Sequence, residues 1–259
     1  MNSGFVQGVL GGKTVNCLLH LLGMKLAQML IAHENKEKAR FLSRFFKTGR
    51  GEYAEGDRFL GLSVPFVRAV CKDFYTLSLA EILVALKNPF HEVRLAALYV
   101  LVGQYERGND EMRKKIVDFY VAHTQYINNW DLVDTSVYKI LGRWIFEGRG
   151  DVKWIKNFAK SRNMWERRMA MVACFAEIRL KKCVVSLEIA ESLLGDSHDL
   201  MHKAVGWMLR EIGKKCGEKT LRTFLDEHAA TMPRTALRYA IEKFDPQMRQ
   251  KYLRMKSAV

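Results

Sequence analysis

Similar groups of residues recur along this chain at offsets of 40, 34, 35 and 32 residues. Each copy has a polar first residue, then small residues, then a long apolar stretch, and the copies begin at Arg94, Asp134, Arg168, Lys203 and, more weakly, Thr235. Further helical segments, such as 152–161 and 185–194, lie between the copies. Helix pairs that repeat at this interval stack on one another, because one pair cannot bury its apolar face alone. The repeat therefore predicts an all-α fold, an α-solenoid of HEAT-like helical repeats with a concave groove.

The rest of the sequence agrees with a helical fold. Apolar residues recur at spacings of three and four through most segments, which is the pattern of helices that bury one face. The four prolines fall where a helix would start or a loop would lie; they are Pro65, Pro89, Pro233 and Pro246. We therefore expect the chain to be almost entirely helical.

The charge balance points to a polyanionic partner. The 259 residues include 42 Lys and Arg against 28 Asp and Glu, which gives a formal net charge of +14. Solubility needs far less, and a surplus of this size favours nucleic acid as the partner ahead of a membrane surface. The alternative is a strongly charged surface that has no partner.

Cysteine and histidine spacings give little sign of a metal site or of disulfides. The five cysteines are widely scattered and include no C-x-x-C pair, so the sequence suggests neither a zinc site nor a disulfide framework. We expect the protein in the reducing cytoplasm, associated with DNA. His198 and His202 have metal-ligand spacing on a helix, but Asp199 stands where a zinc protease needs glutamate. No third ligand is evident, and no metal is expected there.

The first 23 residues are the least regular part of the sequence. The apolar run from Val15 to Leu22 is too short to span a bilayer, and the features of a signal peptide are not evident. An amphipathic helix pattern begins at Met24, which could itself be a natural start. We expect residues 1–23 to be a dispensable N-terminal extension and residues 24–256 to form a single domain.

The first position of each repeat is the most informative one. It holds Arg94, Asp134, Arg168 and Lys203, which is a single acid within a row of bases. If these side chains face the concave side, they line a basic groove with one carboxylate at its centre. The alternative is that they are helix-start residues that pair with one another, with Arg168 as the salt-bridge partner of Asp134. The pattern alone leaves both interpretations open.

The stretch 128–136 supplies cap residues and opens a strongly apolar helix from about Val133 to Phe146. Trp130 and Asp134 are four residues apart, so they would share one face at the start of this helix. Trp207 lies one turn after the basic first residue of its own repeat. A lone tryptophan at that spacing belongs to a core more often than to a site.

Three motifs carry a resemblance to a known family: Asn129-Trp130-Asp131-Leu132-Val133-Asp134, Trp165-Glu166-Arg167-Arg168-Met169-Ala170 and Lys203-Ala204-Val205-Gly206-Trp207-Met208-Leu209-Arg210-Glu211. With Phe59-Leu60-Gly61 and Pro65 upstream, the chain resembles the DNA alkylation repair family of HEAT-like repeat DNA glycosylases, the AlkD type. The resemblance extends from about Met24 to Tyr252. It implies an enzyme that removes cationic N3- and N7-alkylated purines, such as 3-methyladenine and 7-methylguanine, from duplex DNA and so starts base excision repair.

The same resemblance implies roles for individual residues. Asp134 matches the catalytic aspartate of the family, and the two groove tryptophans match Trp130 and Trp207. DNA-binding roles fall on Arg168, which matches the groove arginine, on Lys203 and Arg94 as further phosphate ligands, and on Tyr53, whose spacing to Phe59-Leu60-Gly61 is one residue shorter than in the family.

We expect a monomer that works without a cofactor or a metal, that binds duplex DNA containing alkylated purines, and that has no contact with a membrane. A second class of function stays open at this point. A non-catalytic HEAT-type scaffold or structure-specific DNA-binding protein would use the same helices, with Asp134 as a structural residue. The set of Trp130, Asp134 and Trp207 separates the two classes, because an adaptor has no need of an acid inside a basic groove.

Overall fold

The computed structural model describes residues 23–255, in two compact units that divide after Arg107. The predicted extension 1–23 therefore lies, except for its last residue, outside the described part of the chain. The predicted domain 24–256 includes both units, and its being a single domain stays a prediction.

The first unit is a cluster of helices around one long buried helix. A helix over residues 23–31 comes first. It is followed by α2 (Lys36–Phe45), α3 (Val64–Cys71), a short 3₁₀ turn (Lys72–Phe74), α4 (Leu79–Leu86) and α5 (His91–Arg107). Both α3 and α4 pack on α5, which is buried along most of its length. Ser78 and Glu81 form a capping box that fixes the start of α4.

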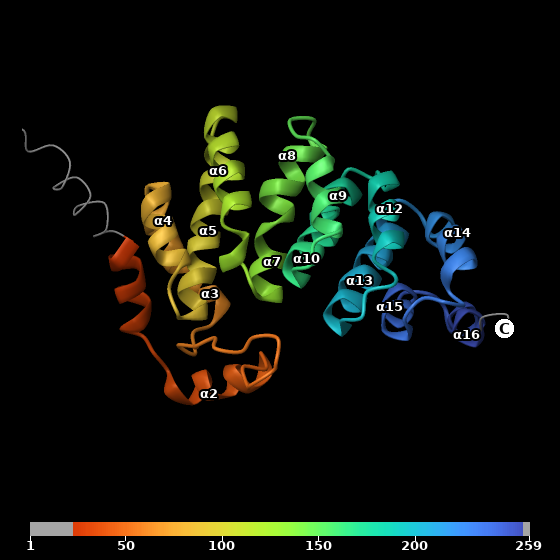
Figure 1. Cartoon of the computed structure of the whole chain (residues 1–259), viewed down its shortest axis with the longest axis horizontal. Helices are drawn as coiled ribbons and strands as arrows, with labels where there is room; N and C mark the ends of the chain where they lie inside the picture. The colour runs from red at the N-terminus through yellow and green to blue at the C-terminus, as the bar shows by residue number, and fades with distance from the viewer. Residues whose placement is uncertain (1–22, 256–259) are drawn as a thin grey trace, which may run out of the picture. The chain divides into compact units, whose positions relative to one another are not determined.

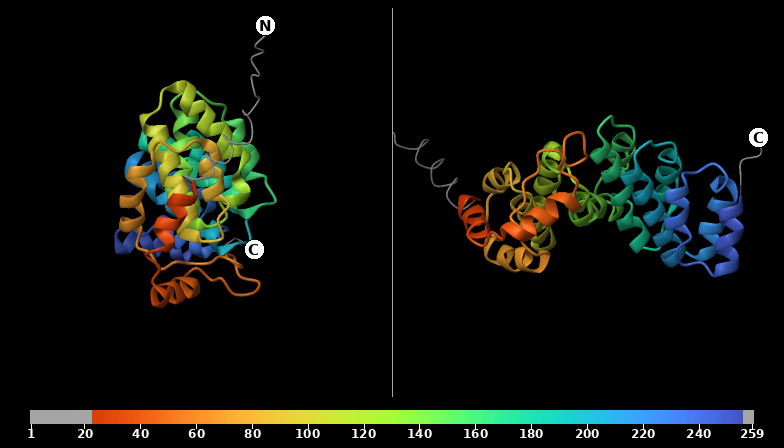
Figure 2. Two further views of the ribbon diagram at one scale, coloured as in Figure 1. Left: turned by 90° about the vertical axis from the view of Figure 1, so that its left-hand side faces the viewer. Right: turned by 90° about the horizontal axis from the view of Figure 1, so that it is seen from below.

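The second unit contains the other four copies of the repeat. Its helices are α6 (Asp110–Ala122), α7 (Trp130–Ser136), α8 (Arg143–Phe146), α9 (Lys153–Ala159), α10 (Met164–Ala173), α11 (Phe175–Arg179), α12 (Val184–Ser192), α13 (Asp199–Lys215), α14 (Glu218–His228), α15 (Arg234–Ala240) and α16 (Pro246–Arg254). The helices α7, α10, α13 and α15 follow one another as packed neighbours (Figure 1). Figure 2 shows the same succession as the colour runs from green to blue. This helical repeat confirms the predicted fold class.

The predicted repeat positions are structurally equivalent in three of these helices. Asp134, Arg168 and Lys203 each lie four residues after the first residue of α7, α10 and α13. The helix around Asp134 begins earlier than expected, at Trp130, because the side chain of Asn129 caps it. The three polar residues therefore share one register on neighbouring helices.

Glycines allow these helices to approach closely. A Cβ on Gly206 of α13 would lie 2.4 Å from the Ala236 carbonyl oxygen of α15. A Cβ on Gly142 would lie 2.4 Å from the Ala173 carbonyl oxygen of α10. An added methyl group at either position would force the helices apart, at a cost of about 1–3 kcal/mol. These contacts agree with the prediction that small residues follow the first position of a repeat.

One π-turn interrupts the helix that carries Asp134. The segment η3 (Tyr138–Gly142) joins α7 to α8, and the Gly142 N–H donates to the Val137 carbonyl five residues earlier at 2.9 Å. Single π-turns inside helices occur frequently at functional sites. Here the extra residue changes the helix register between Asp134 and the apolar end of the helix.

The described residues form no β-strand, and their only bridge joins Arg58 to Phe90. None of the helices in this part of the chain combines the length and the apolar character that crossing a bilayer requires.

Candidate active site

The start of α7 presents the two residues that the sequence singled out. Asn129 is fully buried, and its side-chain oxygen accepts a hydrogen bond from the Trp130 N–H at 2.8 Å. Trp130 and Asp134 lie one turn apart on α7, so they share a face. Both side chains are half-buried rather than sealed in the core.

Asp134 forms a two-pronged ion pair with Arg168 of α10. Arg168 Nε donates to Asp134 Oδ1 at 2.8 Å, and Nη2 donates to Oδ2 at 2.7 Å. This bidentate geometry fixes both the position and the plane of the carboxylate. The side chain of Asp134 is 14% exposed and that of Arg168 is 6% exposed, so Asp134 is the more exposed member of the pair.

Opposing influences act on the protonation of Asp134. Burial raises the pKa of its carboxyl above the ordinary value, and the charge and hydrogen bonds of Arg168 lower it. The neighbouring charge of Asp131 raises the pKa again, and the net direction is upward. Because the other contributions raise the pKa, Arg168 is the group that favours the ionised form of the carboxylate.

Arg168 also reaches α13. Its Nη1 donates to the Leu200 carbonyl at 2.5 Å, so one guanidinium joins α7, α10 and the first turn of α13. With Nε and both Nη atoms engaged inside the protein, Arg168 is built to position Asp134. These bonds use three of the five N–H groups of the guanidinium, and the role of Arg168 as a phosphate ligand stays a prediction.

Three aromatic rings form a row, and two of them, Tyr138 and Phe175, were not predicted from the sequence as site residues. The Tyr138 and Phe175 rings meet edge to face with centroids 5.2 Å apart, and the Phe175 and Trp207 rings are tilted with centroids 6.0 Å apart. Tyr138 lies one turn after Asp134, and Phe175 lies two turns after Arg168. We call Tyr138, Phe175 and Trp207 the aromatic row. It places Trp207 on the same set of helices as Asp134.

Lys203 holds the third of the four repeat positions in this unit. Its Nζ pairs with Asp199 one turn earlier on α13 at 2.7 Å, and 40% of its side chain is exposed. Asp199 has a lowered pKa, first because of its hydrogen bond with Lys203. An exposed pair of this kind contributes little to stability, so Lys203 can exchange its partner for a phosphate at small cost.

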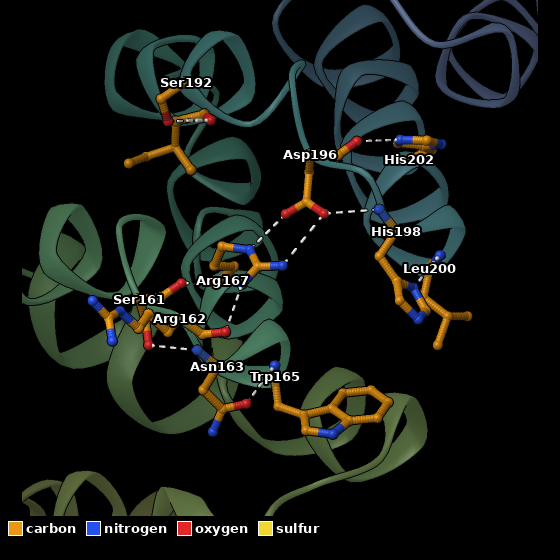
Figure 3. A network of polar contacts seen from close by, with 11 residues as sticks. Ser161, Arg162, Asn163, Trp165, Arg167, Ser192, Asp196, His198, Leu200 and His202 are labelled. Carbon is orange, nitrogen blue, oxygen red and sulfur yellow. Dashed lines mark hydrogen bonds and ion pairs between the residues drawn. The ribbon is translucent and has the colours of Figure 1, made fainter. Parts of the chain in front are cut away.

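A second arginine holds the segment that precedes α13 (Figure 3). Arg167 Nε donates to Asp196 Oδ2 at 2.6 Å, and its Nη1 donates to the carbonyls of Ser161 and Arg162 at 3.0 Å. Asp196 also accepts from the His198 N–H at 2.9 Å. Arg167 and Arg168 are adjacent on α10, so one fixes the loop before α13 and the other fixes its first turn.

Arg94 and Tyr53, the two predicted DNA ligands in the first unit, are in a different setting. Arg94 is buried, and its Nη2 donates to Asp57 Oδ1 at 2.7 Å. His91 Nδ1 lies 3.2 Å from the other oxygen of Asp57. Tyr53 is half-buried in the turns that follow α2. Their DNA-binding roles stay predictions.

The histidine pair of α13 has other roles. His198 Nδ1 accepts from the Leu200 N–H at 3.1 Å and so caps α13, while His202 Nε2 lies 2.5 Å from the Asp196 carbonyl oxygen. Within the described residues, no group of three or more His, Cys, Asp or Glu side chains is placed to hold a metal ion.

Comparisons with known proteins agree with the predicted family and with the helical-repeat fold. The model of the protein family described as DNA alkylation repair enzyme matches residues 26–244. A solved structure described as a predicted DNA alkylation repair enzyme from Enterococcus faecalis is similar, with a TM-score of 0.65 at 20% identity over 83% of this chain and 98% of that chain. At this identity the structural likeness concerns the fold. No curated protein matches the chain significantly.

Proposed function

Because the chain belongs to the family of DNA alkylation repair enzymes, we propose that it is a monofunctional DNA glycosylase that hydrolyses the N-glycosidic bond of cationic N3- or N7-alkylated purines in duplex DNA. The lesions would include 3-methyladenine and 7-methylguanine, and their removal would start base excision repair. The observation that carries the proposal is the bidentate ion pair in which Arg168 fixes the orientation of the partly exposed Asp134 side chain.

The chemistry of the substrate explains why so few groups suffice. A purine alkylated at N3 or N7 already carries a positive charge, so it leaves as a neutral base without a general acid. The glycosidic bond breaks with its electron pair going to the base, and the sugar develops oxocarbenium-like cationic character at its anomeric carbon. The enzyme has to stabilise that cation and supply a water molecule.

Asp134 meets both needs. A carboxylate fixed near the anomeric carbon is complementary to the charge that develops in the transition state, and it can orient the attacking water and accept a proton from it. Removing one preorganised electrostatic group of this kind typically costs about 10²–10³-fold in rate. Arg168 acts as a positioning residue, because it sets the orientation of the carboxylate and lowers its pKa.

Tryptophan faces support the same charge. The face of an indole is negative, so Trp130 and Trp207 beside the deoxyribose would each stabilise a sugar cation by about 0.5–2 kcal/mol. Trp130 shares the face of Asp134 on α7, and Trp207 closes the aromatic row on α13. Their half-buried state leaves part of each ring available to a substrate.

DNA binding would rest on phosphates rather than on base edges. The net charge of +14 supplies the long-range attraction, and Lys203 supplies an exposed cation at the site. We expect the logarithm of the binding constant to fall steeply with the logarithm of salt concentration, with a slope that reports several phosphate contacts. An affinity that hardly changes between low and high salt would contradict this mode of binding.

One observation favours a non-catalytic alternative. Both oxygens of Asp134 accept from Arg168, which is also how a purely structural ion pair would look. In that case the protein would bind unusual DNA structures or act as a scaffold, and the carboxylate would serve only to join α7 to α10.

Release of 7-methylguanine and 3-methyladenine from methylated duplex DNA separates the two functions. We expect single-turnover release by the wild-type protein, a loss of about 10²–10³-fold or more in Asp134→Asn, and nearly unchanged DNA affinity in that variant. Binding without release by the wild type would favour the alternative. Unchanged release by Asp134→Asn would remove Asp134 from the mechanism.

A further inference from the structure

Two cysteines that are far apart in the sequence meet where α12 begins and α13 ends. Cys183 immediately precedes α12, and Cys216 immediately follows α13 (Figure 1). Their thiols hydrogen-bond to each other. Cys216 Sγ also donates to the Lys182 carbonyl at 3.4 Å, and that carbonyl belongs to the peptide group that precedes Cys183.

The other described cysteines are not comparable with this pair. Cys71 and Cys174 are buried, and their thiols donate to the carbonyls of Ala96 and Ala170. Cys183 and Cys216 are only half-buried, so a small reagent can reach them. Among the described cysteines, Cys183 and Cys216 are therefore the pair whose thiols contact each other and can also be reached by a reagent.

We propose that Cys183 and Cys216 are a reversible disulfide site that links the start of α12 to the end of α13. The oxidant would be a small-molecule disulfide of the glutathione class. One cysteine thiolate attacks it and expels one small thiol, and the second cysteine thiolate then attacks the mixed disulfide and expels the other. Two protein thiols lose two hydrogen atoms, and one small disulfide becomes two small thiols.

The surroundings of the pair make it unreactive until an oxidant is abundant. Burial raises the pKa of Cys183, and burial together with the charge of Cys183 raises the pKa of Cys216 to about 12. The charge of Glu177 also contributes to the raised pKa of each thiol. The thiolate is the attacking species, so disulfide formation should be slow at neutral pH and accelerate steadily as the pH rises.

The link would leave the folded structure nearly unchanged, because the two thiols are already in contact. It would close the segment 183–216, which contains Leu200, Lys203 and Trp207. A closed segment of this length restricts the unfolded chain and raises the melting temperature by roughly 5–15 °C. The oxidised protein would thus retain α12 and α13 at temperatures where the reduced protein loses them.

Peptide mapping of the full chain tests the site. The reduced protein is incubated at pH 8.5 with oxidised and reduced glutathione, remaining thiols are blocked, and tryptic peptides are analysed without reductant. We expect the peptide 183–203 to be joined to the peptide 216–219, with a mass that is two hydrogen atoms below the sum of the two peptide masses. The melting temperature should rise with the cross-link and return when a dithiol reductant is added.

Two variants, each with one cysteine replaced by serine, are used so that a folding defect in one variant does not decide the result. Cys183→Ser and Cys216→Ser should each show glutathione on the remaining cysteine and no rise in melting temperature, whereas Cys71→Ser should cross-link like the wild type. Separate glutathione adducts on both cysteines of the wild type would overturn the proposal. A cross-link from Cys17 to either of them would overturn it as well.

Discussion

In each unit an arginine–aspartate pair includes a residue at a repeat position, and these two pairs are built in opposite ways. In the first unit the repeat position holds the base, Arg94, and Asp57 comes from the loop between α2 and α3. In the second unit the repeat position of α7 holds the acid, Asp134, and Arg168 comes from the neighbouring helix. The side chains of Asp57 and Arg94 are 7% and 9% exposed, whereas Asp134 retains 14%.

The surroundings of the two carboxylates differ even more than their exposure. Asp57 contacts His91, whose ring stacks on Phe59 with centroids 4.6 Å apart. Glu92, an acid in the first turn of α5, accepts hydrogen bonds from the N–H groups of Leu60 and Gly61 at 2.8 Å each. The first pair therefore belongs to a cluster that fastens the loop before α3 to α5.

The carboxylate of Asp134 instead pairs with Arg168 of a neighbouring helix through both of its oxygens. The comparison teaches that the same two residue types can fasten a loop or orient a reactive group. Which of the two they do depends on what surrounds the carboxylate. The first pair should thus matter for stability and the second for catalysis.

The largest expected effect is the loss of excision in Asp134→Asn, and Asp57→Asn is its matched control. The amide at position 134 still accepts a hydrogen bond from Arg168 but lacks the negative charge, so single-turnover base release should fall by about 10³-fold. The same substitution at position 57 should leave the rate of the folded protein within about twofold of the wild type. Equal losses in both variants would show that the two pairs do not differ in role.

The reverse contrast is expected in stability. Asp57→Asn leaves Arg94 buried without a full negative partner, and breaking such a pair should lower the free energy of unfolding by about 2–4 kcal/mol. Asp134→Asn should lower it by less, because its carboxyl site is closer to solvent. Urea unfolding followed by circular dichroism measures both values, and a larger loss in Asp134→Asn would contradict the comparison.

Arg168→Lys separates charge from orientation. A lysine retains the positive charge but cannot hold both oxygens of Asp134 and the Leu200 carbonyl together. We expect base release to fall by about 10–100-fold. Because Arg168 lowers the pKa of Asp134, a weaker partner should raise that pKa and move the acidic limb of the pH–rate profile to higher pH.

Arg94→Lys is the matched control for this shift. It should change stability and leave the acidic limb where it is, since Arg94 pairs with Asp57 in the other unit. An unshifted acidic limb in Arg168→Lys would mean that Arg168 has no influence on the ionisation of the catalytic group.

A smaller effect is expected from the aromatic row. Trp207→Phe retains packing against Phe175 but presents a weaker negative face to a cation, so excision should fall by about twofold to tenfold with little change in DNA affinity. Trp154 is 39% exposed on α9, and Trp154→Phe should have no effect on excision. Equal rates for the wild type and Trp207→Phe would limit the aromatic row to packing.

Much of the fold follows from the sequence, because the repeat has a fixed period and its small residues recur with it. Gly206, for example, stands where the backbone of α15 approaches α13 closely. The division after Arg107 could not be predicted, since Gly108-Asn109 there has the composition of an ordinary turn between two helices. Register within a repeat is encoded locally, whereas the boundary between compact units depends on contacts that the sequence does not display.

The candidate site was predictable in part. The pairing of Asp134 with Arg168 followed from their equivalent repeat positions, although only as one of two interpretations. The Leu200 carbonyl could not be found, because a backbone acceptor leaves no trace in residue identity. Tyr138 and Phe175 were missed because aromatic residues at helical spacing usually belong to the core. Their one available signal was their spacing of one and two turns from a repeat position.

The smallest expected effect concerns how the second pair is supported from α13. His198 caps this helix by accepting from the Leu200 N–H, which requires a neutral imidazole. Burial lowers the pKa of His198 below 6.5, although Asp196 and Asp199 oppose this shift; Arg167 and His202 lower the pKa further. The unfolded chain therefore binds the proton first as the pH falls.

Stability from this cap is consequently complete above about pH 6.5 and is lost as the pH falls from there toward the lower pKa of the folded state. Asparagine caps a helix without titrating, so His198→Asn should flatten the profile of unfolding free energy between about pH 6.5 and 5. His202→Asn, which alters the contact with the Asp196 carbonyl, controls for the loss of a nearby histidine. If His198→Asn and the wild type lose stability in parallel on acidification, the cap does not titrate, and the support of Arg168 by Leu200 is independent of pH.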